Sequence, residues 1–236
     1  MNMFTKNSAA RKRGRPPGRS AHGDETRQRL YETAVALIGE RGYDATTLRD
    51  IAGRADVSVG LMYRYFPSKR AVVMALYEQL SAAYADRAAT MPAGPWHARF
   101  MFAMETSLDT LRPHRAALQT LTSIIVSAGE EGLFARGTAF SRLRVQAVFE
   151  RAVLESRKAP PPDIGEPLAR ILYLLHLAVI LWWLLDKSPR QRATQGLLAL
   201  LRQILPAGAL ALRVPLIRRG LRTADELFTD ALLTDG

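Results

Sequence analysis

Residues 24–70 constrain the fold of this chain most strongly, because their pattern predicts one amphipathic helix followed by two short helices around a tight turn. In the first helix, apolar residues recur at three- and four-residue spacing, at Leu30, Ala34, Leu37 and Ile38. This spacing places them on one face of a helix. Gly42 follows the last of these positions and predicts the C-terminal end of the helix.

The two short helices are marked by their capping residues and by the turn between them. Thr47, followed three residues later by Asp50, is close to a capping box and predicts the start of the first. Asp56 occupies the turn, where an Asx residue tolerates left-handed backbone geometry better than most residues do. Ser58 then caps the second helix. The positions predicted to be buried are Leu48, Ile51, Ala52 and Ala55 on the first short helix and Met62 and Phe66 on the second.

The second short helix is too small, and too polar on one face, to serve packing alone. Its outward positions are Val59, Gly60, Leu61, Tyr63, Arg64 and Tyr65. Two short helices with such an outward face form the layout of a helix-turn-helix whose second helix is the recognition helix. We therefore place a helix-turn-helix motif at residues 47–66.

The run ERGYDATTLRDIAGRADVSVGLMYRYFPSK resembles the N-terminal DNA-binding domain of TetR-type transcriptional regulators over about the first third of the chain. The family positions that it fills are Gly42, Tyr43, Thr46, Thr47, Ile51, Ala52, Ala55, Val57, Ser58, Gly60, Tyr63, Tyr65, Phe66 and Lys69. Two positions depart from the family pattern. Asp56 replaces the glycine common in the turn, and Arg70 replaces an acidic residue, which we expect to help DNA binding.

The residue types in this motif suit contacts with duplex DNA. Gly60 allows the backbone to approach a base edge or a phosphate closely. The hydroxyls of Tyr63 and Tyr65 can donate to phosphate oxygens; alternatively, both rings pack at the domain boundary. Arg64 either reads guanine in the major groove or remains a solvated surface charge. The predicted DNA-binding residues are Arg13, Arg15, Thr47, Ser58, Val59, Gly60, Leu61, Tyr63, Arg64, Tyr65 and Lys69.

The segment before this motif is a basic arm. Residues 11–20, RKRGRPPGRS, hold five basic residues, two prolines and two glycines, and they have no apolar face. We therefore expect residues 1–23 to be disordered in the free protein. Arg13-Gly14-Arg15-Pro16 resembles the core of an AT-hook, which inserts arginines into a narrow minor groove. A basic tail that adds non-specific affinity explains the composition equally well.

Composition supports a nucleic-acid partner and excludes several other chemistries. The net charge is +11, and residues 1–70 hold 14 Lys or Arg against 7 Asp or Glu, a local charge of +7. Such an excess is the electrostatic footprint expected on DNA. The absence of cysteine excludes disulfides, thiol catalysis and cysteine-ligated zinc. The four histidines have no metal-ligand spacing, and we expect no metal, no cofactor and no enzymatic activity.

The remaining sequence predicts an all-α chain. We expect helices at 69–89, 96–111, from Pro113 to about 126, and at 138–157, with breaks at MPAGP, AGEEG and APPPD. The expected organisation is a basic arm (1–23), a DNA-binding domain (24–84), a helical effector-binding and dimerisation domain (85–205) and a C-terminal extension (206–236). The sequence of this extension does not indicate whether it folds back on the core or reaches across a dimer.

The most apolar stretch, LARILYLLHLAVILWWLL at residues 168–185, is predicted to be a buried helix. Its apolar run, from Ile171 to Leu185, is shorter than a membrane span and is broken by His176. In TetR-type proteins the last two long helices form a four-helix dimer interface, which implies a homodimer through residues 166–185 and 189–205 here. The twofold symmetry of a dimer suits a palindromic operator. Leu197→Asp or Leu201→Asp would probe this interface.

The resemblance also implies a small-molecule effector that binds the C-terminal domain and releases DNA. The candidate lining residues are Trp96, Phe100, Met104, His114, Phe149, Tyr173, His176 and Trp182, although aromatic residues at helical spacing are more often plain core. Such a lining suits a hydrophobic or aromatic effector. The expected protein is a bacterial, cytoplasmic repressor. The alternative is an architectural DNA-binding protein without a specific operator or effector.

Overall fold

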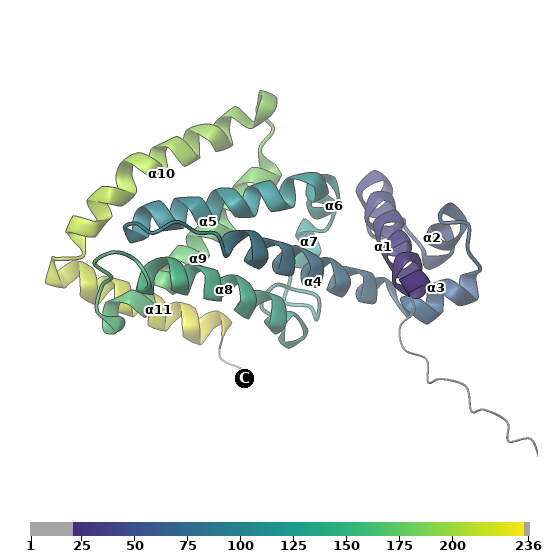
Figure 1. Cartoon of the computed structure of the whole chain (residues 1–236), viewed down its shortest axis with the longest axis horizontal. Helices are drawn as coiled ribbons and strands as arrows, with labels where there is room; N and C mark the ends of the chain where they lie inside the picture. Colours follow the sequence, from purple (N-terminus) through teal and green to yellow (C-terminus); the bar gives the residue numbers. More distant parts are fainter. Residues whose placement is uncertain (1–20, 234–236) are drawn as a thin grey trace, which may run out of the picture.

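The computed structural model describes residues 21–233, and over this range the chain is helical and contains no strand (Figure 1). The all-α prediction is therefore confirmed. A small domain of three helices stands at one end of the molecule, and a larger helical bundle forms the rest. Residues 1–20 of the basic arm, with Arg13 and Arg15, lie outside the described residues.

The N-terminal domain consists of α1 (Ala21–Arg41), α2 (Leu48–Arg54) and α3 (Val59–Tyr65). Helix α1 begins three residues before the expected boundary at residue 24 and ends at Arg41, directly before Gly42, whose φ of 88° suits glycine. The apolar positions predicted for these helices are all buried, at Leu30, Ala34, Leu37, Ile38, Leu48, Ile51, Ala52, Ala55, Met62 and Phe66. One small core therefore holds the three helices together.

The larger bundle is built around α4 (Lys69–Ala88), α5 (Trp96–Leu111), α8 (Ala139–Leu154) and α9 (Pro162–Leu185). Helix α4 starts beside the recognition helix and continues without a break into the bundle, so residue 84, the expected domain boundary, lies inside it. The largest buried side chains of the bundle include Phe100, Met104, Phe149, Tyr173 and Trp183.

The prediction of a single helix from Pro113 to about residue 126 is wrong. The structure has a short 3-10 turn, η1 (Arg112–His114), followed by α6 (Arg115–Thr120) and α7 (Thr122–Ile125). The hydroxyls of Thr120 and Thr122 donate to carbonyls of the preceding turn, at 2.8 and 3.0 Å. Such back-bonding competes with the backbone ladder and bends helices, which accounts for the break.

The C-terminal extension folds back on the bundle. Helix α10 (Arg192–Ala211) runs through Pro206, six residues past the expected end at Leu205, and α11 (Pro215–Leu232) follows after a bend of 112°. Helix α11 packs along α9 (Figure 1), where Arg170 donates to both carboxylate oxygens of Asp225 at 2.6 and 2.7 Å. Phe228 meets Phe134 edge-on, with ring centroids 6.1 Å apart.

Helix α9 is covered on one side only within a single chain. By length and composition it could cross a membrane, since its most apolar 18-residue stretch has a mean hydropathy of 2.0. Of that stretch, 44% is buried inside the chain. Helices α8 and α11 cover that side. One face of α9 therefore stays open within a single chain, where Leu181, Trp182 and Leu185 are 37%, 50% and 60% exposed.

Candidate DNA-binding surface and effector cavity

The structure contains the capping residues and the turn conformation that the sequence predicts for the helix-turn-helix. Thr47 Oγ1 accepts from the Asp50 amide at 3.1 Å, and an Asp50 oxygen accepts from the Thr47 amide at 2.9 Å, which completes a capping box. Asp56 has the left-handed φ of 52° expected in the turn. Ser58 Oγ accepts from the Leu61 amide at 3.1 Å. These bonds cap the first turns of α2 and α3.

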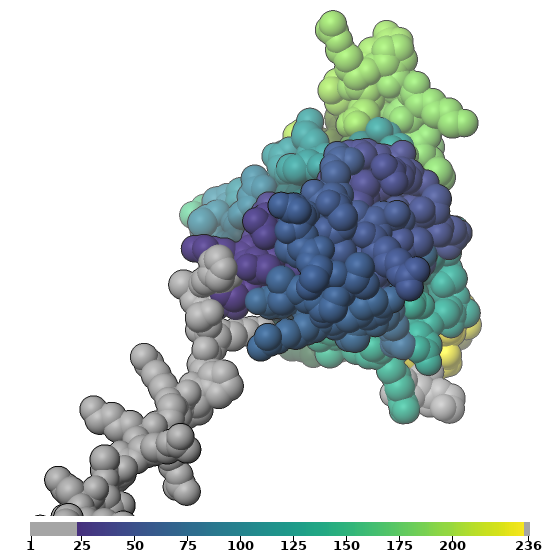
Figure 2. Space-filling model, turned by 90° about the vertical axis from the view of Figure 1, so that its right-hand side faces the viewer, coloured from purple at the N-terminus to yellow at the C-terminus, as the bar shows by residue number. Residues whose placement is uncertain are grey.

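The outer face of α3 carries two polar side chains, those of Tyr63 and Arg64, that have no hydrogen-bond or ion-pair partner among the described residues. Tyr63 is 50% exposed, and Arg64 is exposed as well. Val59 is 39% exposed, and Gly60 lies in open space where even a Cβ would meet nothing. Leu61 and Tyr65 are half-buried. In Figure 2 the domain formed by α1, α2 and α3 faces the viewer as one end of the molecule. The outer face of α3 is therefore open to solvent.

Lys69 and Arg70 are already engaged within the chain. The Lys69 ammonium donates to the Tyr43 carbonyl oxygen at 2.8 Å and lies 4.4 Å from the centroid of the Tyr43 ring. It therefore ties the start of α4 to the loop between α1 and α2, next to the recognition helix. Arg70 forms an ion pair with Glu130, in the loop after α7, rather than standing free for DNA.

The bundle contains a partly open cavity of ≈ 130 Å³ whose lining is mostly apolar. Its walls come from α4, α5, α8 and α9, with α6, α7 and the loop after α7 closing one end. The lining residues are Tyr77, Leu80, Ser81, Tyr84, Ser107, Leu111, Leu118, Ile125, Leu133, Ser141, Arg142, Val145, Tyr173, His176, Leu177, Ile180 and Leu184. A largely apolar enclosure with a few polar groups is the usual form of a small-molecule site.

Two of the eight candidate effector residues, Tyr173 and His176, line this cavity. Phe100, Met104 and Phe149 are fully buried core residues, and the Phe149 ring centroid is 4.7 Å from that of His176. His114 is half-buried in η1, and Trp96 borders a different groove, beside Pro160 and Ala209. Trp182 is 50% exposed on the outer face of α9. The structure thus separates residues that the sequence had grouped.

Sequence reasoning missed Tyr77, Tyr84 and Arg142. The two tyrosines recur at helical spacing with Leu80 on the inner face of α4, so their pattern is that of an amphipathic helix with polar tips. This spacing is visible in the sequence, but a helix face that only packs against the core has the same spacing. Nothing in the local sequence distinguishes Arg142 from Arg144, two residues further along α8.

The polar groups of the cavity are buried and only partly satisfied. His176 Nε2 and Ser107 Oγ lie 2.8 Å apart and share a hydrogen bond, whereas His176 Nδ1 has no partner among the described residues. Burial lowers the pKa of His176 to about 3, so the imidazole is neutral at physiological pH. The hydroxyls of Tyr84 and Tyr173 also lack partners, and burial raises the pKa of both.

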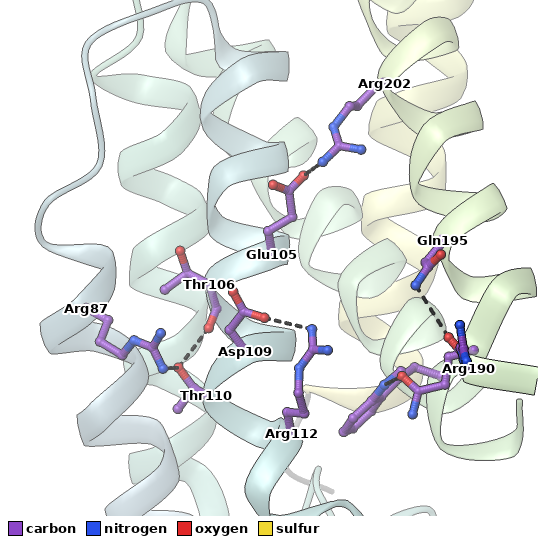
Figure 3. Close-up of polar contacts among 11 residues, drawn as sticks. Arg87, Glu105, Thr106, Asp109, Thr110, Arg112, Arg190, Gln195 and Arg202 are labelled. Carbon is purple, nitrogen blue, oxygen red and sulfur yellow. Dashed lines mark hydrogen bonds and ion pairs between the residues drawn. The ribbon is translucent and has the colours of Figure 1, made fainter.

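Polar contacts along α5 connect it to α4 on one side and to α10 on the other (Figure 3). Arg87 of α4 donates to the hydroxyl of Thr110 at 3.2 Å. Glu105 forms an ion pair with Arg202 of α10 at 2.5 Å. Among the described residues, no group of three or more His, Asp or Glu could hold a metal ion.

Comparison with known proteins identifies relatives for both parts of the chain. Residues 30–76 match the family model for bacterial regulatory proteins of the tetR family. The HTH-type transcriptional repressor KstR of Mycobacterium tuberculosis is 29% identical over 172 residues, which cover 70% of this chain and 73% of that protein. The HTH-type transcriptional regulator EthR of Mycolicibacterium smegmatis is 26% identical over 191 residues, covering 79% and 87% respectively.

Solved structures share the fold. A tetR-family transcriptional regulator from Streptomyces coelicolor matches with a TM-score of 0.60 and 22% identity, over 86% of this chain and 89% of that one. The TetR transcriptional regulator from Nitrosomonas europaea matches with a TM-score of 0.57 and 21% identity, over 77% of this chain and 98% of that one. The arrangement of the bundle behind the helix-turn-helix is therefore shared with these proteins.

Proposed function

Because this chain belongs to the TetR family of bacterial regulatory proteins and is a DNA-binding transcriptional regulator, we propose that it is a homodimeric repressor of a palindromic operator, released by a small hydrophobic or aromatic molecule. The observation that carries the proposal is the outward face of α3. There Tyr63 and Arg64 are presented, without internal partners, on a helix fixed by the Ser58 cap. We place the protein in the bacterial cytoplasm, associated with the nucleoid when it is bound to DNA.

The residues around α3 divide into contacts that position the protein and contacts that read sequence. The Tyr63 hydroxyl and the charge of Lys69 suit phosphates, which fix register but carry no sequence information. Arg64, Val59 and Gly60 suit base edges, since a guanidinium pairs with guanine and an apolar side chain packs on a thymine methyl. Thr47 and Ser58 contribute by capping, because their hydroxyls are engaged in α2 and α3.

The dimer is proposed to form through the apolar stripes that α9 and α10 leave uncovered. On α9 the exposed Leu181, Trp182 and Leu185 recur at helical spacing. On α10 Leu200 and Ile204, four residues apart, are 51% and 50% exposed. Exposed apolar stripes of this kind mark interaction surfaces. A twofold axis through them would place two recognition helices on successive major grooves of one face of DNA.

The structure changes which residues should probe this interface. Leu201 is only 5% exposed within a single chain, so Leu201→Asp would damage the core of the subunit itself. Leu200→Asp and Ile204→Asp place the charge on the uncovered stripe instead. We expect both variants to be monomeric by light scattering, whereas Leu216→Asp, at a 75% exposed position on α11, stays dimeric. Dimers of the Leu200 and Ile204 variants would contradict the proposed interface.

The effector is proposed to act through α4. Tyr77, Leu80 and Tyr84 of this helix line the cavity, and its first residue, Lys69, is bonded to the loop of the DNA-binding domain. A ligand that displaces these side chains would move both ends of one rigid helix. A molecule that binds more tightly to the displaced arrangement shifts the protein away from the DNA-binding one.

Selection of bound duplexes from a random DNA pool, at near-physiological salt, tests the regulatory function. We expect the wild-type protein to enrich a palindrome, Tyr63→Ala to lose that enrichment, and Arg219→Ala on α11 to retain it. Binding without any enriched palindrome would instead favour the architectural alternative, in which affinity falls steeply with salt and random duplexes compete well.

A further inference from the structure

Arg142, which lines the cavity, has a guanidinium whose hydrogen-bonding capacity is only partly used. Arg142 Nη1 donates to the carbonyl oxygens of Leu133 and Ala135 at 3.3 and 3.4 Å, both long for hydrogen bonds. Its Nε is buried and has no partner, and no carboxylate pairs with it among the described residues. A positive charge at the wall of an apolar cavity is therefore left without a counter-ion.

Arg99, in the same bundle, shows how a buried guanidinium is normally accommodated. Its three nitrogens donate to three backbone carbonyl oxygens at 2.9 to 3.1 Å, and Glu155 lies 3.6 Å away. Arg170 likewise donates twice to the carboxylate of Asp225. Buried charges need such partners because the loss of hydration is otherwise uncompensated. Arg142, which is half-buried, has only long bonds to carbonyl oxygens and no carboxylate partner among the described residues, and it lines the cavity.

The other groups around the cavity do not neutralise this charge. The lining contains no Asp or Glu. The neutral His176 adds neither charge nor counter-charge. Tyr84 and Tyr173 offer hydroxyls without partners, and Arg142 is close enough to Tyr173 to oppose, by its charge, the rise in the pKa of that tyrosine caused by burial. The remaining wall is leucine-rich, so the cavity has one electropositive, hydrogen-bond-donating region in an apolar enclosure.

We propose that the ligand of this cavity is a compact lipophilic carboxylic acid, whose carboxylate pairs with Arg142 and accepts a hydrogen bond from the Tyr173 hydroxyl. Its apolar part lies among Leu80, Leu118 and Leu177. The proposal rests on the proposed function, in which this cavity receives the effector. A carboxylate supplies both the missing counter-charge and acceptors for unused donors, and charge-assisted bonds are about twice as strong as neutral ones. An amine would place a second positive charge beside Arg142.

The first test needs no variant. The full-length wild-type protein is titrated calorimetrically with phenylbutyrate, phenylbutanol and phenylbutylamine, which share one apolar body, and then with hexanoate, hexanol and hexylamine. We expect the acid of each set to bind at least about tenfold more tightly than the alcohol, as a charge-assisted pair implies, and the amine to bind more weakly still. Equal binding within each set, or no binding by either acid, overturns the proposal.

Variants then assign the preference to Arg142. Arg142→Gln should remove the advantage of the acid over the alcohol while the affinity for the alcohol is unchanged. Tyr173→Phe, which keeps the ring, should reduce the affinity for the acid by a smaller factor. Arg222→Gln, on the exposed side of α11, is the matched control and should behave as the wild type does. If Arg142→Gln fails to fold, Tyr173→Phe and the wild-type comparison still decide the question. An unchanged preference in Arg142→Gln overturns the assignment.

Release of operator DNA separates this inference from the function on which it rests. If the acids bind in an Arg142-dependent way but DNA stays bound, the ligand class holds and the effector role of the cavity fails. If neutral or basic compounds release DNA and the acids do not, the effector role holds and the ligand class proposed here is wrong.

Discussion

The recognition helix and the cavity expose their chemistry in opposite ways. Tyr63 and Arg64 stand in solvent on a seven-residue helix that is fixed by caps and two buried anchors, Met62 and Phe66. The polar groups of the cavity are enclosed by leucines and by one another. Function and stability are therefore separable at the DNA-binding end, where a side chain can change without loss of packing. In the bundle the same side chains line the cavity and pack the core, so a substitution that alters ligand binding is expected to alter stability as well.

The largest effect is expected from a core residue of the bundle. Phe100 is fully buried against Phe149, with ring centroids 5.8 Å apart, so Phe100→Ala should lower the free energy of unfolding by about 3–5 kcal/mol. Phe140 is 38% exposed at the start of α8, and Phe140→Ala should cost under about 1 kcal/mol. Denaturant unfolding of both variants measures the difference. Similar losses would remove the contrast between core and surface in the bundle.

The buried histidine should make stability depend on pH. Because the folded pKa of His176, about 3, lies below its ordinary value of 6.5, the unfolded chain takes up the proton first as the pH falls. The stabilisation is complete above about pH 6.5 and is lost toward pH 3, by about 2 kcal/mol between pH 7 and pH 5. Chemical unfolding measured at several pH values across this range should show that the free energy of unfolding depends less steeply on pH for His176→Gln than for the wild type. Identical slopes would mean that His176 is more hydrated than its enclosure indicates.

At the DNA-binding end, removal of a single hydroxyl should alter affinity alone. Tyr63→Phe should weaken binding to the selected operator by about 1.5 kcal/mol, roughly tenfold, because a hydrogen bond to a charged phosphate is lost. The melting temperature should not change, since the Tyr63 side chain is half exposed and bonds to no described residue. Fluorescence anisotropy and thermal melts measure the two quantities. Wild-type affinity in this variant would assign the role of Tyr63 to its ring.

The smallest effect is expected at a cap. Thr47→Ala removes the hydroxyl that accepts from the Asp50 amide and should cost about 1 kcal/mol of stability. Thr47→Ser keeps the cap and should stay close to the wild type. Operator affinity is expected to fall only as far as α2 loses order. A Thr47→Ala protein that is fully stable but binds DNA poorly would instead assign Thr47 a direct contact, and would blur the separation of function from stability at this end.

The helix-turn-helix could be predicted because its determinants lie within a few residues of one another. The Thr47–Asp50 box, the left-handed Asp56 and the four-residue spacing of Met62 and Phe66 each act locally, and each appears in the structure as expected. Lys69 shows the limit of this reasoning. Its position beside the motif was evident, but its bond to the Tyr43 carbonyl joins residues 26 positions apart.

Sequence alone determined the helical class, the caps and the recognition face, since periodicity and capping depend on neighbours along the chain. Tertiary structure decided the fold-back of α11, because the Arg170–Asp225 pair spans 55 residues and local patterning carries no record of it. It also decided the cavity, which four distant helices enclose, and thereby set Arg142 apart from the other arginines of α8. A charge becomes distinctive only through what surrounds it, and those surroundings exist only in the folded chain.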